Sequence, residues 1–407
     1  MAFFLWSLDV VTATRIAHPA LLVILPIAGG VAGALQARFA GAADRGTHLI
    51  LDEIDVPRAG VPVRLAPMVL LGTLVTHLFG GSAGREGTAV QMGGALAHVF
   101  DRLGLQRVPG GARISQAQRA MLLQAGVAAG FGSVFGTPFA GALFALEVTR
   151  RRRVTSLALL SCLLSALLAH VVVMQFGVQH TPYPRIAAPP LDGITVTAVF
   201  TFQVAIAAMA SGIVAMLFAR STRGLAHLLR RRIRHPWMRP AIGGTIVVLL
   251  VLLTGTRDYL GLGVTSSDAG TVTILSSFVE EGARPFSWAM KWLFTTITVA
   301  SGFKGGEVTP LFFIGAALGN AVATLLHAPV MLLAALCMVA TLAGATRTPI
   351  ACAVLGCELF GVSAAPWFVV ACLLARACAG GTSIYDEPGQ HDDDGIAATS
   401  TGRLANQ

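Results

Sequence analysis

A glutamate and an arginine lie at the edge of membrane-depth sequence, where charged side chains are rare. Gly84-Arg85-Glu86-Gly87-Thr88 follows a run without charged residues that begins at Ala66, and it opens another apolar run. Because a charge at membrane depth costs about 3 kcal/mol, its presence indicates a function. The small residues on both sides are typical of a broken helix whose free N–H groups bind an anion. Glu86 would then be a titratable anion at the place where a permeant anion binds.

A second stretch with the same spacing lies far downstream. Gly305-Gly306-Glu307-Val308-Thr309-Pro310 repeats the positions of Gly84, Glu86 and Thr88, and it opens an uncharged run that extends to Thr346. Two half-helix N-termini of one design are what a transporter with internal repeats directs at a central site.

The residues of the second stretch have different expected roles. Val308 and Thr309 are expected to contribute their backbone N–H groups. Glu307 has two interpretations: a carboxylate that stabilises its own helix N-terminus, or a second protonatable group beside the pore. The residues alone leave both open.

The composition predicts an all-α polytopic membrane protein. The 407 residues are 55% hydrophobic and only 12% charged, too few charges to cover a soluble domain of this size. Several uncharged runs exceed the roughly 20 residues that span a bilayer as a helix, and none alternates as a transmembrane β-barrel would. The net charge of +9 lies mainly in arginine clusters at 150–153 and 230–234, which the positive-inside tendency places in the cytoplasm. Without a separate basic face, nucleic-acid binding is disfavoured.

Other classes of function find little support. The six cysteines lie in apolar segments without the spacing of metal ligands, so we predict no disulfide framework, no metal site and no cofactor. No signal peptide is predicted, because the N-terminus lacks a basic region. The chain has no His-Glu-x-x-His motif and no paired intramembrane aspartates, which argues against a membrane-embedded enzyme.

An internal repeat divides the chain into two halves. Three anchors recur in the same order at nearly one offset, which is improbable by chance. They are Thr137-Pro138 with Glu147 and Thr348-Pro349 with Glu358, Met121 and Met331, and Cys162 and Cys372. We interpret Glu147 and Glu358 as structural groups at ion pairs or helix ends. Halves with an odd number of spans would be inverted in the membrane, with the site at their interface.

The predicted organisation has five parts. Residues 1–17 form an N-terminal interfacial helix on the cytoplasmic surface, and residues 18–180 form the first membrane repeat. A Pro-rich linker at 181–194 leads to the second repeat at 195–385. Residues 386–407 are a disordered polar tail.

Gly84-Arg85-Glu86-Gly87, with Gly93-Gly94 behind it, resembles the gating-glutamate signature of the CLC family of chloride channels and transporters. The stretch at 305–310 resembles the start of that family's second anion-binding helix, and Tyr385 resembles the tyrosine that closes its inner side. The resemblance covers about residues 18–386 in order. It implies the CLC fold, with two inverted-topology helical repeats of broken and tilted helices, and a homodimer whose subunits each hold a pore.

Two details resemble the bacterial fluoride/proton antiporter branch of this family. Thr88 stands where chloride-type members have proline, and Glu307-Val308-Thr309-Pro310 replaces their Gly-x-Phe-x-Pro pattern. Members of that branch exchange fluoride for protons. The resemblance makes Glu86 the gating and proton-carrying residue, and it implies an anion site made of Gly46, Thr47, Arg85, Glu86, Gly87, Thr88, Glu307, Val308, Thr309 and Tyr385.

Two positions depart from the family patterns. Thr47 takes the place of the central serine of chloride-type members, where many fluoride-type members have methionine. Its hydroxyl donates one hydrogen bond to an anion and would serve fluoride or chloride. Val148 stands where many chloride exchangers have an internal glutamate, so protons either use another route, with Glu307 and Glu86, or the chain is a passive channel. The fluoride branch also lacks that glutamate, which favours the first.

We therefore predict a fluoride/proton antiporter that exports fluoride from the cytoplasm across a bacterial inner membrane. Its partners are fluoride, with chloride as the alternative anion, protons and bilayer lipid. The alternative function is a chloride-type Cl⁻/H⁺ exchanger or a passive voltage-gated chloride channel of the same fold.

Overall fold

The computed structural model describes residues 1–56, 58, 60–102, 115–149, 155–187, 193–266 and 270–386. The arginine cluster at 150–153, part of the linker and the tail from residue 387 onward lie outside the described residues. Asp386, predicted as the start of the tail, is buried in the folded part of the chain.

The described residues form helices and contain no strand. The first half comprises α1 (Ala2–Ala17), α2 (Leu25–Phe39), α3 (Thr47–Asp55), α4 (Leu65–Leu78), α5 (Glu86–Arg102), α6 (Gln116–Phe135), α7 (Pro138–Glu147) and α8 (Ser156–Gln175). The second half comprises α9 (Ile194–Arg232), α10 (Met238–Thr254), α11 (Ser287–Ala300), α12 (Val308–Leu326), α13 (Val330–Thr346), α14 (Pro349–Phe360) and α15 (Ala365–Cys378). Short 3₁₀ turns lie at Pro19–Ile24, Gly41–Arg45, Ser276–Phe278 and Val362–Ala364.

Local sequence sets several of these boundaries. Ser115 forms a capping box with Gln118 and so begins α6. Pro138 and Pro349 each occupy the first position of a helix, where proline's missing N–H is not needed. Gly136, in the left-handed conformation at φ 73°, ends α6 directly before α7.

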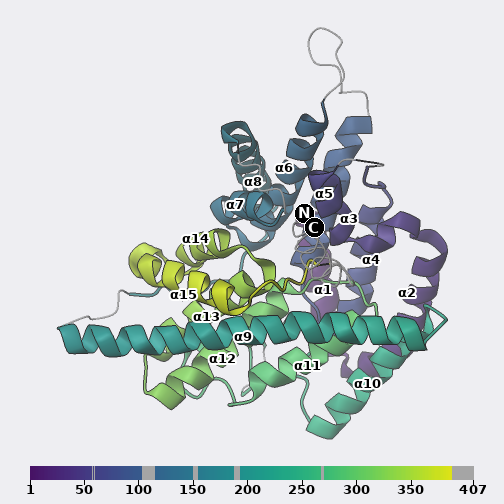
Figure 1. Cartoon of the computed structure of the whole chain (residues 1–407). Coiled ribbons are helices and arrows are strands. Elements are labelled where there is room, and N and C mark those ends of the chain that lie inside the picture. Colours follow the sequence, from purple (N-terminus) through teal and green to yellow (C-terminus); the bar gives the residue numbers. More distant parts are fainter. Residues whose placement is uncertain are drawn as a thin grey trace, which may run out of the picture.

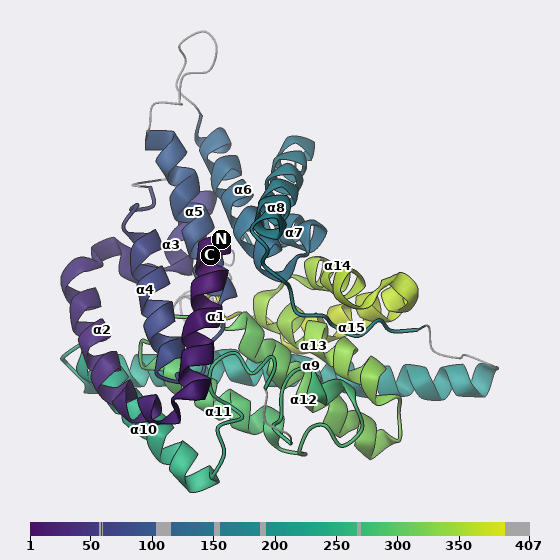
Figure 2. The same ribbon diagram turned by 180° about the vertical axis from the view of Figure 1, so that it is seen from behind.

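The two halves occupy different parts of the molecule (Figure 1). Helices α3 to α8 fill the upper part of that view, and α9 runs across beneath them with the other helices of the second half around it. The halves meet where α7 packs on α14 and where α2 packs on α10, and the view from behind shows the same division (Figure 2).

The repeat anchors lie on equivalent helices. Met121 lies on α6 and Met331 on α13, while Cys162 lies on α8 and Cys372 on α15. The packing is equivalent as well, since α5 contacts α6 as α12 contacts α13. The order α5 to α8 is thus repeated as α12 to α15.

Two glutamates join the halves in a reciprocal way. Glu358 on α14 accepts hydrogen bonds from the N–H groups of Phe139 (3.1 Å) and Ala140 (2.7 Å) in the first turn of α7. Glu147 at the end of α7 accepts from the N–H groups of Ile350 (3.2 Å) and Ala351 (2.8 Å) in α14. Each carboxylate therefore stabilises the N-terminus of the other helix, which supports the helix-end interpretation.

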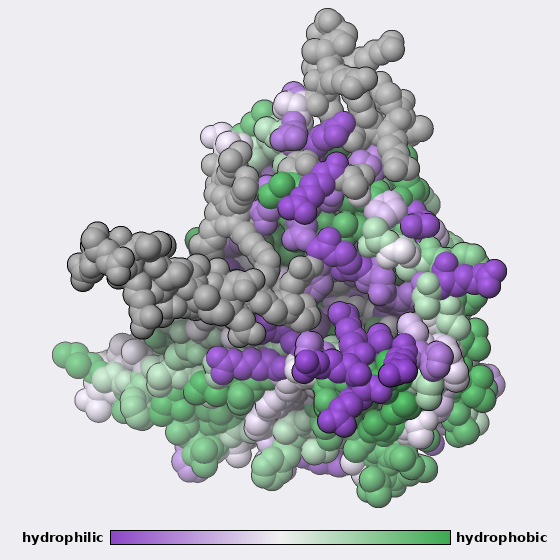
Figure 3. Space-filling view, turned by 45° about the vertical axis from the view of Figure 1, so that its right-hand side comes forward, coloured by the Kyte–Doolittle hydropathy of each residue, from purple (hydrophilic) through white to green (hydrophobic). Residues whose placement is uncertain are grey.

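The surface is that of a membrane protein. Large apolar side chains are exposed on several outer helices, among them Ile27 (69%), Leu168 (65%), Phe202 (64%) and Leu252 (72%). Figure 3 shows hydrophobic side chains over the lower part of one face and hydrophilic ones gathered in its middle. Four described segments are long and apolar enough to cross a membrane: Pro19–Phe39, Ser156–Gln175, Ile194–Arg232 and Val308–Leu326. The fold is thus an all-α polytopic membrane fold, as the composition predicted.

Helix α1 packs along α4 (Figure 2), and it buries Phe4, Leu5 and Leu8. Its predicted place at the cytoplasmic membrane surface stays a prediction.

Candidate functional site

Two loops that are distant in the sequence meet at the centre of the fold. The N–H of Gly84 donates to the carbonyl of Gly306 at 2.6 Å, and the N–H of Gly306 donates to the carbonyl of Gly84 at 2.7 Å. This bridge brings the N-terminus of α5, which begins at Glu86, against that of α12, which begins at Val308. The two repeated motifs are therefore neighbours, and two positive helix ends converge on one place.

Glycine is needed at this junction because the two backbones nearly touch. A Cβ atom on Gly306 would lie 2.7 Å from the amide nitrogen of Gly87, and one on Gly84 would lie 2.7 Å from Glu86 Oε2. Both distances are shorter than real Cβ contacts. Any larger residue would separate the loops or displace the Glu86 carboxylate.

The carboxylate of Glu86 is fully buried and held by donors from both loops. Its Oε2 accepts from the N–H of Thr309 and from the N–H of Arg85, each at 3.1 Å. Its Oε1 accepts from the hydroxyl of Thr309. The Arg85 guanidinium adds positive charge, with Nε 3.8 Å from Oε1. Because these donors suit any small anion, the carboxylate occupies an anion-binding arrangement.

The other predicted residues of the two motifs are placed differently. Thr309 contributes its hydroxyl in addition to the predicted backbone N–H. The hydroxyl of Thr88 lies 2.6 Å from that of Thr73 on α4, so this side chain ties α5 to α4 and does not bond to the Glu86 carboxylate. Val308 is buried as the first residue of α12.

Thr47 is fixed to α5 by a residue that the sequence analysis did not select. Gln91 Nε2 donates to Thr47 Oγ1 at 3.1 Å, and its Oε1 is buried without a hydrogen-bond partner. Gly46, at φ 54°, directly precedes α3, which begins at Thr47. A Cβ atom on Gly46 would lie 3.0 Å from Oε1 of the same Gln91 amide. As the Thr47 oxygen accepts from Gln91, its hydroxyl hydrogen is free to donate elsewhere.

Two helices fix the loop that precedes Glu86. His77 on α4 contacts the carbonyl of Ala83 through Nε2 at 3.1 Å, and Thr298 on α11 accepts from the N–H of Ser82 at 3.1 Å. The Ser82 hydroxyl also lies 2.9 Å from that of Thr295. His77 is thus a buried packing residue that ties α4 to this loop through hydrogen bonds. His77 precedes Glu86 by the same spacing as Thr298 precedes Glu307, a signal that sequence reasoning missed.

A second polar cluster surrounds Tyr385. Asp386 Oδ2 accepts from the N–H of Ser383 at 2.8 Å and from Arg347 Nη2 at 2.7 Å, and it lies 3.8 Å from Arg223 Nη1. These contacts hold the Ser383 to Tyr385 turn against α9 and α13. Arg223 also acts electrostatically on Glu307. Asp386 went unrecognised in the sequence because nothing local distinguishes it from the acidic tail.

Cavities approach this centre from two directions. One of about 260 Å³ is lined by Tyr385, Asp386, Glu147 and Val148. Another of about 850 Å³ is lined by Arg85 among other residues. A narrow pocket at Arg85 and Thr309 lies between the larger cavity and the Glu86 carboxylate. Thr309, which bonds to the Glu86 carboxylate, thus lies beside this narrow pocket.

The family model that describes voltage gated chloride channels matches residues 24–380. The chain belongs to this family, the CLC family. It is 43% identical over 394 residues to the chloride/fluoride channel protein of Pseudomonas syringae pv. tomato, a match that covers 94% of this chain and 82% of that protein.

Solved CLC structures share the fold. The chain aligns with the crystal structure of a CLC-type fluoride/proton antiporter with a TM-score of 0.84 and 33% identity, over 94% of this chain and 92% of that one. A slow cyanobacterial Cl⁻/H⁺ antiporter has a TM-score of 0.76 at 20% identity, over 100% and 95% of the two chains, which bears on the fold alone. The CLC fold predicted from the two motifs, with its two inverted helical repeats, is confirmed.

Proposed function

We propose that this CLC protein is a fluoride/proton antiporter that exports fluoride from the cytoplasm. The observation that carries the proposal is the Glu86 carboxylate, which occupies donors from two converging helix N-termini. A group that takes the place of an anion and can also take up a proton couples the two movements. The similarity to a chloride/fluoride channel protein and to a fluoride/proton antiporter supports fluoride as the anion.

The proposed cycle alternates two states of Glu86. When deprotonated, it binds the N–H and hydroxyl of Thr309 and excludes the anion. When protonated, it loses the charge that these donors stabilise and leaves the site, so that fluoride takes its place. Return of the carboxylate then displaces fluoride and releases the proton on the other side.

Protons need a route that does not use Val148. We propose Glu307 as the second protonatable group, because it lies at the N-terminus of α12 close enough to Tyr385 and Arg223 for electrostatic interaction. The cavity lined by Tyr385 and Asp386 would supply water to this side. This assigns to Glu307 the second of its two interpretations.

Thr47 is proposed to contribute to anion selection. Since Gln91 donates to its oxygen, the Thr47 hydroxyl would present its hydrogen to the anion. Fluoride is the strongest hydrogen-bond acceptor among the halides. Gly46, Arg85, Gly87, Thr88, Val308 and Tyr385 complete the proposed site, Thr88 through the position of α5.

The proposed membrane placement follows the arginines of α9. Arg223 lies beside Asp386, and Arg230–Arg232 form the last turn of the same helix. The positive-inside tendency then puts the Tyr385 cavity in the cytoplasm and the Arg85 cavity on the outer side. Because Thr12 and Arg15 line the Arg85 cavity, this proposal puts the C-terminal end of α1 on the outer side, in place of the cytoplasmic position predicted from the sequence. We propose a multi-pass protein of a bacterial inner membrane that works as a homodimer.

The test is a flux measurement with purified protein in liposomes. Fluoride and chloride efflux are recorded together with proton movement. We expect fluoride efflux with opposing proton uptake and little chloride flux. Equal chloride flux would contradict the fluoride assignment, and anion flux without proton movement would show a channel.

A further inference from the structure

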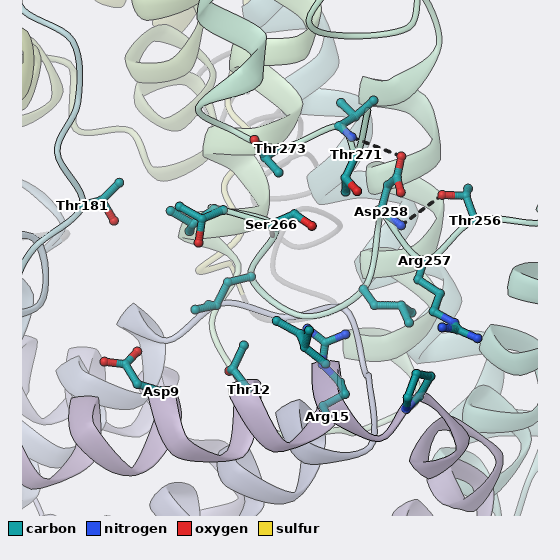
Figure 4. A pocket seen from close by; sticks show the side chains of 18 of the residues that line it. Asp9, Thr12, Arg15, Thr181, Thr256, Arg257, Asp258, Ser266, Thr271 and Thr273 are labelled. Carbon is teal, nitrogen blue, oxygen red and sulfur yellow. Dashed lines mark hydrogen bonds between the residues drawn. The ribbon is translucent and has the colours of Figure 1, made fainter. Parts of the chain in front are cut away.

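The cavity beside Arg85 has the chemistry of an anion site of its own. It measures about 850 Å³, and hydroxyl groups from α1 and from the segment after α10 line it. Figure 4 shows Thr12, Thr256, Ser266, Thr271 and Thr273 around this cavity. The lining hydroxyl groups include those of Thr12, Thr256, Thr265, Ser266, Thr271 and Thr273. Hydroxyl donors together with positive charge are suited to a strongly hydrated inorganic anion, because they replace its lost water.

Arg15 is the cation that faces this cavity from α1. It is partly buried, and its Nε is buried without a hydrogen-bond partner. Thr12, one helical turn earlier, likewise has a buried hydroxyl oxygen without a partner. Two such groups on one face of α1 are available to a ligand, since buried polar groups are normally paired.

The acidic residues of the cavity do not neutralise Arg15. Among the described residues, Arg15 forms no ion pair with a carboxylate. Asp258 accepts instead from the N–H of Val272 at 3.2 Å, and Asp9 lies nearer the N-terminus of α1, where it interacts electrostatically with Arg85 (Figure 4). The positive charge of Arg15 therefore remains for a ligand.

A second arginine and a buried lysine stand near Arg15. Arg257 lines the same cavity and acts on Arg15 electrostatically. The fully buried Lys291 on α11 donates from Nζ to the carbonyls of Tyr259 (3.1 Å) and Gly261 (2.7 Å), in the segment after α10. It has no carboxylate partner among the residues that the structure describes. The positive charges of Arg15 and Arg257 repel one another, and a bound anion relieves the repulsion.

The cavity is continuous with the approach to Glu86. Arg85, Thr181 and Val264 line both this cavity and the narrow pocket that reaches Thr309. An anion held at Arg15 is therefore positioned on the way to or from the central site.

We propose that Arg15 and Thr12 form a second anion site, which binds a small inorganic anion before it reaches the Glu86 site or after it leaves. The identification of this anion as fluoride rests on the proposed function. The existence of the second site does not depend on it. The site raises the local anion concentration where the central site opens.

The test compares the concentration dependence of flux. Initial fluoride and chloride fluxes are measured in proteoliposomes at low ionic strength for the wild type, Arg15→Gln and Arg15→Lys. The loss of one charge about 4 Å from the anion is expected to raise the half-saturating concentration about 5-fold in Arg15→Gln. The rate at saturation is expected to stay unchanged. Arg15→Lys, which keeps the charge, is expected to restore most of the affinity.

A matched control is Arg231→Gln, which removes the same charge from an exposed position on α9. It is expected to behave as the wild type. Equal half-saturating concentrations in the wild type and Arg15→Gln, or the same shift in Arg231→Gln, would overturn the second site. A wild type that transports chloride and no fluoride would overturn the proposed function, yet the comparison of variants in chloride would still decide the site.

If Arg15→Gln does not fold, the variant Thr12→Val tests the second anion site instead. It removes only the unpaired hydroxyl and is expected to raise the half-saturating concentration about 3-fold, the effect of losing one hydrogen-bond donor of about 0.6 kcal/mol. An unchanged value in this variant would then overturn the proposal.

Discussion

The N-termini of α5 and α12 carry the same motif and use it differently. Both begin after glycines and place a glutamate and a threonine at the same spacing. Glu86 is fully buried and bound to Thr309, whereas Glu307 lies beside α12 without a side-chain hydrogen bond to its own helix end. Thr309 donates to the glutamate of the other half, whereas Thr88 bonds to Thr73 of α4. The same motif thus supplies the carboxylate in the first half of the chain and hydrogen-bond donors to that carboxylate in the second half.

The largest effect on transport is expected when the two glutamates, Glu86 and Glu307, are replaced in turn. Glu86→Gln is expected to abolish proton movement coupled to anion flux, because an amide cannot carry a proton, while anion flux continues. Glu307→Gln is the matched change: its amide cannot pass a proton on either, so proton movement coupled to anion flux is expected to fall several-fold, with the remainder carried by water from the Tyr385 cavity. Anion and proton fluxes in liposomes measure both. Coupled transport that persists in Glu86→Gln would overturn the mechanism, and loss of coupling in Glu307→Gln alone would move the proton-carrying role to α12.

A smaller effect is expected at the two threonines. Thr309→Val removes a hydrogen bond to a charged group, worth about 2 kcal/mol, and is expected to lower the rate of coupled transport at least tenfold. Thr88→Val has the same change of shape but loses only a bond between hydroxyls, about 1 kcal/mol of stability. Its transport rate is expected to stay within about twofold of the wild type. The comparison fails if the two variants transport equally.

The smallest effect on transport is expected where the halves are symmetric. Glu147→Gln and Glu358→Gln each remove the charge at the N-terminus of the opposite helix, and each is expected to cost about 1 kcal/mol of stability. Thermal unfolding in detergent measures this loss, and flux per folded protein should be unchanged. Clearly unequal losses would show that the reciprocal contact is not equivalent in the two halves.

The sequence was informative wherever the physics is local or periodic. Uncharged runs predicted membrane helices, and the recurrence of Thr137-Pro138 at Thr348-Pro349 predicted equivalent helix starts. The glycines at 84 and 306 marked the loops that touch. Gln91 and Asp386 were missed because their partners, Thr47 and Arg347, lie on other elements. A polar residue in an apolar helix does not reveal which distant backbone it faces.

By itself, the sequence determined the class of the protein, its repeat and the identity of its central glutamate, because composition and spacing are properties of the chain. Only the tertiary structure decided which threonine bonds to Glu86, and that Arg15 faces a cavity without a carboxylate partner among the described residues. The physical reason is that a hydrogen bond or an unpaired charge depends on which surfaces pack together. Packing places Thr309 beside Glu86 and Thr88 beside Thr73 of α4, although the two motifs are almost the same in sequence.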